Sequence, residues 1–316
     1  MEVELEGVLV GHAQDLEALT GCSVIVFPEG AVAGVDVRGG APASRETELL
    51  RSTRLVERVN AFLLTGGSAF GLAAADGVMS FLEERGWGFD ALVVKVPIVP
   101  AAALFDLTVG DHSVRPDASM GYAACLAASR DLSASGNVGA GTGATVGKVL
   151  GNEFCMKGGL GFASFRSQDG LEVAAWVAVN SFGDVVGDDG VIIAGARSPE
   201  GGFLDTEAFL EGAAGGFPEG EPGRNTTLGV LVTNARLSKA EVNWLAQAGH
   251  RGFARAIRPS HTRLDGDTVF AAALRRVEAP LDLVAVIGVR VMARAVREAV
   301  LSAAGVAGIP AVADLA

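Results

Sequence analysis

A pair of hydroxyl residues at the head of a long apolar run constrains this chain more than any other feature. Thr226 and Thr227 open the stretch 226–235, TTLGVLVTNA, whose apolar and β-branched residues are typical of a buried β-strand. A segment rich in glycine, proline and glutamate precedes it, from Arg197 to Gly223. We interpret residues 197–225 as a linker, and its junction with the strand suits a scissile bond between Asn225 and Thr226 better than a hairpin.

Cleavage at this junction would create a catalyst. A threonine hydroxyl is a weak nucleophile, but the freed α-amine of Thr226, with a pKa of roughly 7.7–8.0, would lie beside it as a base. Two other interpretations stay open at this point. Thr226 and Thr227 can simply open a strand, as threonines often do, or Asn225-Thr226-Thr227 can accept an N-linked glycan in a secreted protein. The N-terminal residues MEVELE lack the pattern of a signal peptide, which favours a cytoplasmic protein.

The composition narrows the classes of partner. A formal net charge of −12 argues against nucleic acid and anionic membranes, which require a basic face. No run of about 18 apolar residues lacks a charge or a proline, so we expect no membrane span. The three cysteines, Cys22, Cys125 and Cys155, have no metal-ligand spacing and are predicted to be buried small hydrophobic residues. We therefore expect a small-molecule or short-peptide substrate and neither a metal nor a cofactor.

Two glycine-rich stretches invite other functions. Residues 66–71, GGSAFG, follow a predicted strand and precede a predicted helix, as in a nucleophile elbow around Ser68, but Phe70 stands where that motif needs glycine. Residues 136–148, GNVGAGTGATVGK, suggest a phosphate loop, but Thr142 and Val149 break its template. We interpret the first stretch as a tight turn and the second as an approach to a pocket that Lys148 lines.

Periodicity and breakers predict the remaining elements. Ser238-Lys239-Ala240-Glu241 is a capping box that opens a helix, which Pro259 should end. The other predicted helices span 72–84, 118–129 and 281–304, and the other predicted strands span 7–10, 23–27, 31–37, 60–65, 93–99, 160–165, 173–180 and 191–194.

Polar residues at two element ends are candidates for catalysis. Asn180 ends a predicted strand, where an amide can donate to a developing oxyanion, although asparagine is also an ordinary turn residue. Asp265 and Asp267 flank Gly266, so a tight turn would bring both carboxylates to one point. Aspartates are also common in turns, and a metal site there would lack further ligands.

Taken together, these stretches resemble the DmpA-like family of self-cleaving aminopeptidases and amidases, which includes β-aminopeptidases and nylon-oligomer hydrolases. The resemblance covers nearly the whole chain, and its stretches are Gly11-His12, 36–40, 66–71, 139–148, Val179-Asn180, Asn225-Thr226-Thr227 and 261–270. It implies one α/β domain over residues 1–316, folded as a four-layer αββα sandwich like that of ornithine acetyltransferase. It also implies cleavage into fragments 1–225 and 226–316, and a homo-oligomer of such pairs, often a tetramer.

Site residues follow from the same resemblance. It implies that Thr226 is the nucleophile and that Asp265 and Asp267 are its acidic partners, as in the nylon-oligomer hydrolases; β-aminopeptidases have Ser and Glu there. Lys148 matches a pocket lysine, and Asn180 matches an oxyanion-hole asparagine. Phe105 stands where relatives have a pocket tyrosine, so one hydroxyl donor is lost.

The function expected is an N-terminal threonine hydrolase that cleaves amide bonds through an acyl-enzyme on Thr226. Its substrates would be small peptides, amino-acid amides or ω-amino-acid oligomers. Two alternatives stay open, namely an acyltransferase of the ornithine-acetyltransferase type and an uncleaved, non-catalytic homologue.

Overall fold

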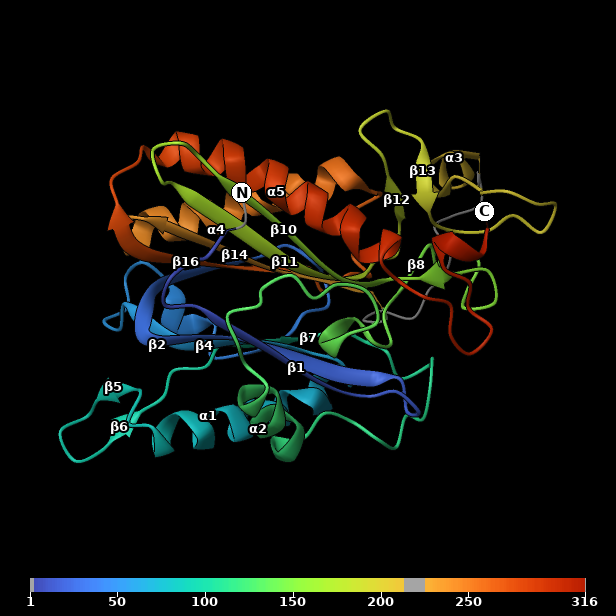
Figure 1. Ribbon diagram of the computed structural model, residues 1–316. Helices are drawn as coiled ribbons and strands as arrows, with labels where there is room; N and C mark the ends of the chain where they lie inside the picture. Colours follow the sequence, from blue (N-terminus) through green and yellow to red (C-terminus); the bar gives the residue numbers. More distant parts are fainter. Residues whose placement is uncertain (1–2, 213–224, 316) are drawn as a thin grey trace.

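The computed structural model describes residues 3–212 and 225–315, whose helices and strands stack in four layers (Figure 1). Helices α4 (Lys239–Ala256) and α5 (Leu281–Leu301) form one outer layer, and α1 (Ala74–Glu84) and α2 (Ala118–Leu126) form the other. Two layers of β-sheet lie between them. This arrangement confirms the predicted α/β sandwich.

Both sheet layers belong to one hydrogen-bonded sheet. Among the described residues it has nine strands, in the order β10-β11-β14-β16-β2-β4-β7-β3, with β1 beside β2. These strands are β1 (Leu9–Asp15), β2 (Thr20–Val37), β3 (Ala43–Arg45), β4 (Arg58–Thr65), β7 (Ala101–Ala103), β10 (Gly159–Arg166), β11 (Glu172–Asn180), β14 (Thr226–Ala235) and β16 (Thr268–Val277).

Strand β2 connects the two layers. Its residues 32–37 pair with β16, and its residues 22–26 and 31–32 pair with β4, with a register shift between Val26 and Ala31. Pro28 and Gly30 lie at this shift, where a missing N–H and a φ of +71° are tolerated. The sequence predicted two separate strands here, because both residues are typical of turns. Pairing on both sides instead keeps the chain extended through them.

Three hydrophobic clusters fill the spaces between the four layers. Successive side chains of β11 point to opposite faces, so Val177 packs with the cluster that contains α4 and α5, and Trp176 packs between the sheet layers. Phe62 stacks on Phe270 in that middle cluster, with ring centroids 4.8 Å apart. The third cluster joins Val24 to helix α1. Burial on both faces explains why β14 is apolar from Leu228 to Val232.

Helices α2, α4 and α5 start as the sequence predicts and end earlier, whereas α1 starts two residues later than predicted and ends at Glu84 as predicted. Ser238 and Glu241 form the predicted capping box of α4, but the helix ends at Ala256, because the chain then pairs as strand β15 (Ile257–Arg258). The last helix ends at Leu301. The Gly66-Gly67 turn is also confirmed: Gly67 has a φ of +76° and leads into the 3₁₀ turn η2 (Ser68–Ala73).

The predicted strand over 93–99 was wrong. The apolar stretch 93–99 is not a strand, since only β6 (Lys95–Val96) pairs there, in a hairpin with β5 (Phe89–Asp90). Leu92 and Val93 are 97% and 93% exposed at its tip. Within the predicted linker 197–225 the structure contains helix α3 (Thr206–Gly212), for which no prediction was made. The part of this linker from 213 to 224 lies outside the described residues.

Short elements complete the described chain. A three-stranded sheet contains β12, β13 and β15, and β8 pairs with β9. Their bounds and those of the other 3₁₀ turns are β8 (Thr145–Val146), β9 (Met156–Lys157), β12 (Asp184–Val186), β13 (Ile192–Ala194), η1 (Glu48–Leu50), η3 (Gly139–Gly141) and η4 (Val312–Asp314). Within residues 3–212 and 225–315, no helix has both the length and the apolar character needed to cross a membrane.

Candidate active site

Thr226 is the first residue of β14, and the sheet register decides what surrounds it. Strand β11 runs antiparallel to β14 and ends at Asn180, directly opposite Thr226. Thr226 is 2% exposed, and its Oγ1 donates to the carbonyl oxygen of Asn225 at 2.5 Å. The predicted nucleophile therefore lies against the peptide bond that precedes it.

The turn before β16 closes the other side of this bond. Gly266 N donates to the Asn225 carbonyl oxygen at 2.8 Å, and Asp267 Oδ1 accepts a hydrogen bond from Thr227 N at 2.7 Å. Asp265 pairs with Asn225 in an isolated parallel bridge. The structure thus brings Asp265 and Asp267 to the residues on either side of Thr226, and it places the Gly266 N–H, which was not predicted, against the Asn225 carbonyl.

Asp265 is held by donors on two segments. Its Oδ2 accepts hydrogen bonds from Thr262 N at 2.8 Å and Thr262 Oγ1 at 2.5 Å, and its Oδ1 accepts one from Phe182 N at 3.3 Å. Burial, followed by repulsion from Asp267, nevertheless raises the pKa of Asp265 from 3.8 to about 6. The carboxyl therefore changes charge within a pH range in which an enzyme can be assayed.

Lys148 and Asn180 meet on the opposite side of the site. Lys148 Nζ donates to Asn180 Oδ1 at 2.7 Å and to the Asn180 carbonyl at 3.1 Å. Burial lowers the pKa of Lys148 to about 7, although the charges of Cys155, Asp265 and Asp106 oppose that shift. A partly protonated ammonium beside Asn180, opposite Thr226 in the sheet, is suited to stabilising a developing negative charge.

Asn180 also has a structural role. Its side chain is fully buried, its Oδ1 accepts a hydrogen bond from Thr145 N at 3.0 Å, and its Nδ2 donates to the Phe105 carbonyl at 2.9 Å. Phe105 therefore approaches the site through its backbone, at the position where the sequence analysis noted a missing tyrosine hydroxyl. Substitution of Asn180 would disturb these contacts as well as any oxyanion donor.

His261 is a residue of this site to which the sequence analysis assigned no role. The ring Nδ1 of His261 lies 2.7 Å from Asp267 Oδ2, and the backbone N–H of His261 donates to the same oxygen at 3.2 Å. Burial opposes protonation of His261, but the hydrogen bond and charge of Asp267 outweigh it and raise its pKa. The signal available in the sequence was a histidine six residues before Asp267, inside the stretch 261–270.

Lys157 was also missed, and it organises the glycine-rich segment near Lys148. It is fully buried, and its Nζ donates to the carbonyls of Gly141, Ala144 and Gly158 at 2.8, 2.9 and 3.0 Å. Thr145, whose backbone N–H donates to Asn180 Oδ1, directly follows Ala144 in the chain. The segment 136–148 is thus a backbone cradle around an ammonium group and not a phosphate loop.

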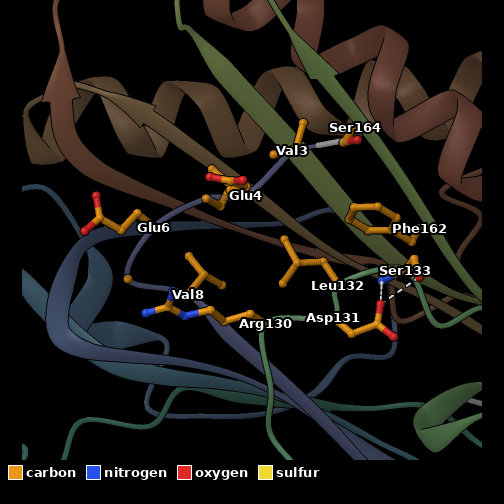
Figure 2. Close-up of a pocket in the computed structure, with 12 residues that line it drawn as sticks. Val3, Glu4, Glu6, Val8, Arg130, Asp131, Leu132, Ser133, Phe162 and Ser164 are labelled. Carbon is orange, nitrogen blue, oxygen red and sulfur yellow. Dashed lines mark hydrogen bonds between the residues drawn. The ribbon is translucent and has the colours of Figure 1, made fainter. Parts of the chain in front are cut away.

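A cavity of about 670 Å³ lies elsewhere on the molecule. Figure 2 shows the N-terminal segment and Arg130 to Ser133 around it, with Phe162 and Ser164 of β10. Phe162 and Ser164 lie opposite Trp176 and Ala174 of β11. These positions are four to six residues from Asn180, or roughly 13–20 Å at about 3.3 Å per residue. The chemistry expected at Thr226 therefore lies outside this cavity.

Comparison with known proteins shows similarity along the whole chain. The family described as Peptidase family S58 matches residues 3–312. An uncharacterized aminopeptidase of Mycobacterium tuberculosis (strain ATCC 25618 / H37Rv) is 42% identical over 99% of this chain and 96% of its own length. A 6-aminohexanoate-oligomer endohydrolase of Paenarthrobacter ureafaciens is 32% identical over 89% of this chain and 76% of its own length.

Solved structures share the fold at lower sequence identity. A Burkholderia sp. β-aminopeptidase is 21% identical, with a TM-score of 0.71 over 98% of this chain and 90% of that chain. The L-aminopeptidase D-Ala-esterase/amidase from Ochrobactrum anthropi, described as a variant of the Ntn hydrolase fold, is 20% identical. Its TM-score is 0.70 over 94% of this chain and 85% of that chain.

Proposed function

The chain belongs to peptidase family S58, and on this premise we propose that it hydrolyses amide bonds with Thr226 as an N-terminal nucleophile. In this proposal the chain cuts itself between Asn225 and Thr226, which leaves fragments 1–225 and 226–316. The observation that carries the proposal is the 2.5 Å contact between Thr226 Oγ1 and the carbonyl oxygen of Asn225 in a buried, register-fixed site.

The first stage is self-cleavage. Thr226 Oγ attacks the Asn225 carbonyl carbon, the carbon–nitrogen bond breaks, and the acyl group moves from nitrogen to oxygen. Water then hydrolyses the ester. The products are a carboxylate on Asn225 and a free amine on Thr226.

The second stage is turnover. The neutral Thr226 amine takes the proton of its own hydroxyl, and Oγ attacks a substrate carbonyl to form an acyl-enzyme. Asn180 and Lys148 stabilise the oxyanion, and the proton leaves with the amine product. Water then hydrolyses the acyl-enzyme, which releases the carboxylic acid and restores the Thr226 hydroxyl. Asp265 and Asp267 interact with the ammonium and hydroxyl of Thr226. The hydrogen bond from Thr227 N to the Asp267 carboxylate and the backbone bridge between Asn225 and Asp265 support this assignment.

The proposed substrates have an amide bond in a small molecule. Relatives include proteins named aminopeptidases and proteins named 6-aminohexanoate-oligomer endohydrolases, so we propose amino-acid amides, short peptides with a free N-terminus, or short ω-amino-acid oligomers. The formal net charge of −12 favours substrates that carry an ammonium group.

Adjacent threonines allow a matched test of the nucleophile. Thr227 is fully buried, like its neighbour, but its Oγ1 has no hydrogen-bond partner among the described residues. We expect wild type and Thr227→Ala to give two bands and two masses on a denaturing gel and by intact mass spectrometry. Thr226→Ser should also be cut, because it keeps a hydroxyl.

Thr226→Ala should give one uncut chain without activity, because it loses both the attacking hydroxyl and the route to a free amine. Cleavage of Thr226→Ala at the wild-type rate would refute the proposal. A panel of α- and β-amino-acid amides, D- and L-peptides and aminohexanoate oligomers, each assayed with and without an acceptor amine, would then identify the substrate class and separate hydrolysis from acyl transfer.

A further inference from the structure

The carbonyl of the proposed scissile bond already has a backbone donor. Gly266 N donates to the Asn225 carbonyl oxygen at 2.8 Å, and Thr226 Oγ1 lies 2.5 Å from the same oxygen. Asn225 is 4% exposed, so bulk water has little access to that oxygen. A buried carbonyl that accepts a fixed N–H bond is polarised toward the charge that attack on its carbon creates.

The turn that carries this N–H is fixed on two sides. Ala41 N donates to the Asp265 carbonyl at 2.9 Å, and Arg38 N donates to the Asp267 carbonyl at 3.0 Å. On the other side, the Asp267 carboxylate accepts a hydrogen bond from Thr227 N at 2.7 Å. The direction of the Gly266 N–H is therefore set before any reaction, as electrostatic stabilisation of a transition state requires.

Glycine is needed at this position because of the close approach. A Cβ atom on Gly266 would lie 2.7 Å from the Ala41 carbonyl oxygen and 2.8 Å from Thr226 Oγ1. A side chain would push the turn away from the start of β14 and lengthen the contact with the Asn225 carbonyl. The sequence Asp-Gly-Asp thus combines two carboxylates with a backbone donor that only glycine can bring this close.

We propose that the Gly266 N–H stabilises the oxyanion formed when the chain cuts itself, an inference that rests on the self-cleavage proposed above. As Thr226 Oγ bonds to the Asn225 carbonyl carbon, the π electron pair of the carbonyl moves onto oxygen, which faces Gly266. Collapse restores the carbonyl and breaks the carbon–nitrogen bond, and the hydroxyl proton ends on the departing nitrogen. Self-cleavage therefore draws on a donor from the turn before β16, whereas Asn180 lies opposite Thr226 at the end of β11 and Lys148, which follows β8, donates to Asn180.

Replacing one backbone amide by an ester tests this donor directly. Glycolic acid introduced at position 266 of the full chain by nonsense suppression would remove the N–H without adding a side chain. Self-cleavage at pH 7, followed by denaturing gel and intact mass, should slow by a factor on the order of 10²–10³, the usual cost of one oxyanion donor. Fragment masses separate a cut at 225/226 from hydrolysis of the ester itself.

The matched control is the same replacement at Gly190, whose N–H donates to the Gly187 carbonyl at 3.2 Å. We expect the Gly190 ester to be cut like wild type. Equal cleavage rates for the two esters would overturn the role of Gly266 while leaving self-cleavage intact. An uncut wild-type chain would instead refute the proposed function.

A second pair of variants decides the matter if the Gly266 ester does not fold. Gly266→Ala keeps the N–H but displaces the turn from Thr226, so it should also be cut slowly. Gly88→Ala places a Cβ atom 2.8 Å from the carbonyl carbon of Val96, beside the hairpin of β5 and β6 and away from this turn, and provides the steric control. Gly266→Ala cut as fast as Gly88→Ala would overturn the inference.

Discussion

Asp265→Asn should remove a pH dependence of stability that the structure predicts for the uncut chain. The Asp265 carboxyl is 2% exposed, and its pKa is raised from 3.8 to about 6 by burial and by Asp267. Because the folded state binds this proton more tightly than the unfolded state, the stabilisation is complete below pH 3.8 and is lost as the pH rises through about 6. A shift of this size corresponds to about 3 kcal/mol.

The expected change in melting temperature follows from chain size. An unfolding entropy of about 2.1 cal/mol/K per residue converts 3 kcal/mol into roughly 4–5 °C for a chain of this length. Relative to its parent, the Asp265→Asn chain should therefore gain about that much as the pH rises from 4 to 7. The absolute stability of Asp265→Asn at pH 7 should rise by less than this relative gain. Thr262 N and Phe182 N both donate to the carboxylate, and the NH₂ group of the new amide cannot accept from whichever of them it faces.

The assay is thermal unfolding between pH 4 and pH 8 in a Thr226→Ala background, where no cleavage and no new amine are expected. Asp267→Asn should flatten the same dependence in part, because the charge of Asp267 is one of the two causes of the shift. Asp188→Asn controls for the loss of one carboxylate at the surface, since that side chain is 92% exposed. Identical pH slopes for the parent and Asp265→Asn would refute the electrostatic reasoning.

Three further predictions concern the residues around this site. Lys148→Met should lower kcat by a factor on the order of 10²–10³ at pH 7. It should also abolish the fall of kcat at alkaline pH that a Lys148 pKa of about 7 predicts for wild type. A variant whose kcat follows the wild-type pH profile would contradict the role of Lys148. His261→Phe should lower kcat/KM by about 10- to 100-fold, which is the value of one hydrogen bond to a charged group. His261→Gln should recover part of this loss, because its amide can still donate to Asp267. Equal losses of kcat/KM in both variants would point to packing alone. Lys157→Met leaves three carbonyls without their ammonium donor and should cost about 3 kcal/mol or more, so an unchanged melting temperature would show that the carbonyls find other donors.

Local chemistry was sufficient to predict much of the scaffold. The capping box at Ser238, the apolar strand after Thr226 and the turn at Gly66-Gly67 depend on residues within a few positions of one another. The same local rules failed at Pro28 and at 93–99. At Pro28, pairing with β4 and β16 overrides turn preference, and at Val93 nothing in the apolar pattern indicates that the hairpin tip is exposed.

By itself, therefore, the sequence determined the residue types and the local elements that carry the site: a threonine at the head of a strand, an Asp-Gly-Asp turn and an asparagine at a strand end. Only the tertiary structure decided which atoms meet. The pairing of Asn180 with Thr226 and the contact between the Gly266 N–H and the Asn225 carbonyl join segments about 40 residues or more apart. Their geometry depends on the register of neighbouring strands, and that register is selected by burial of both sheet faces, a property of the assembled layers that no local pattern contains.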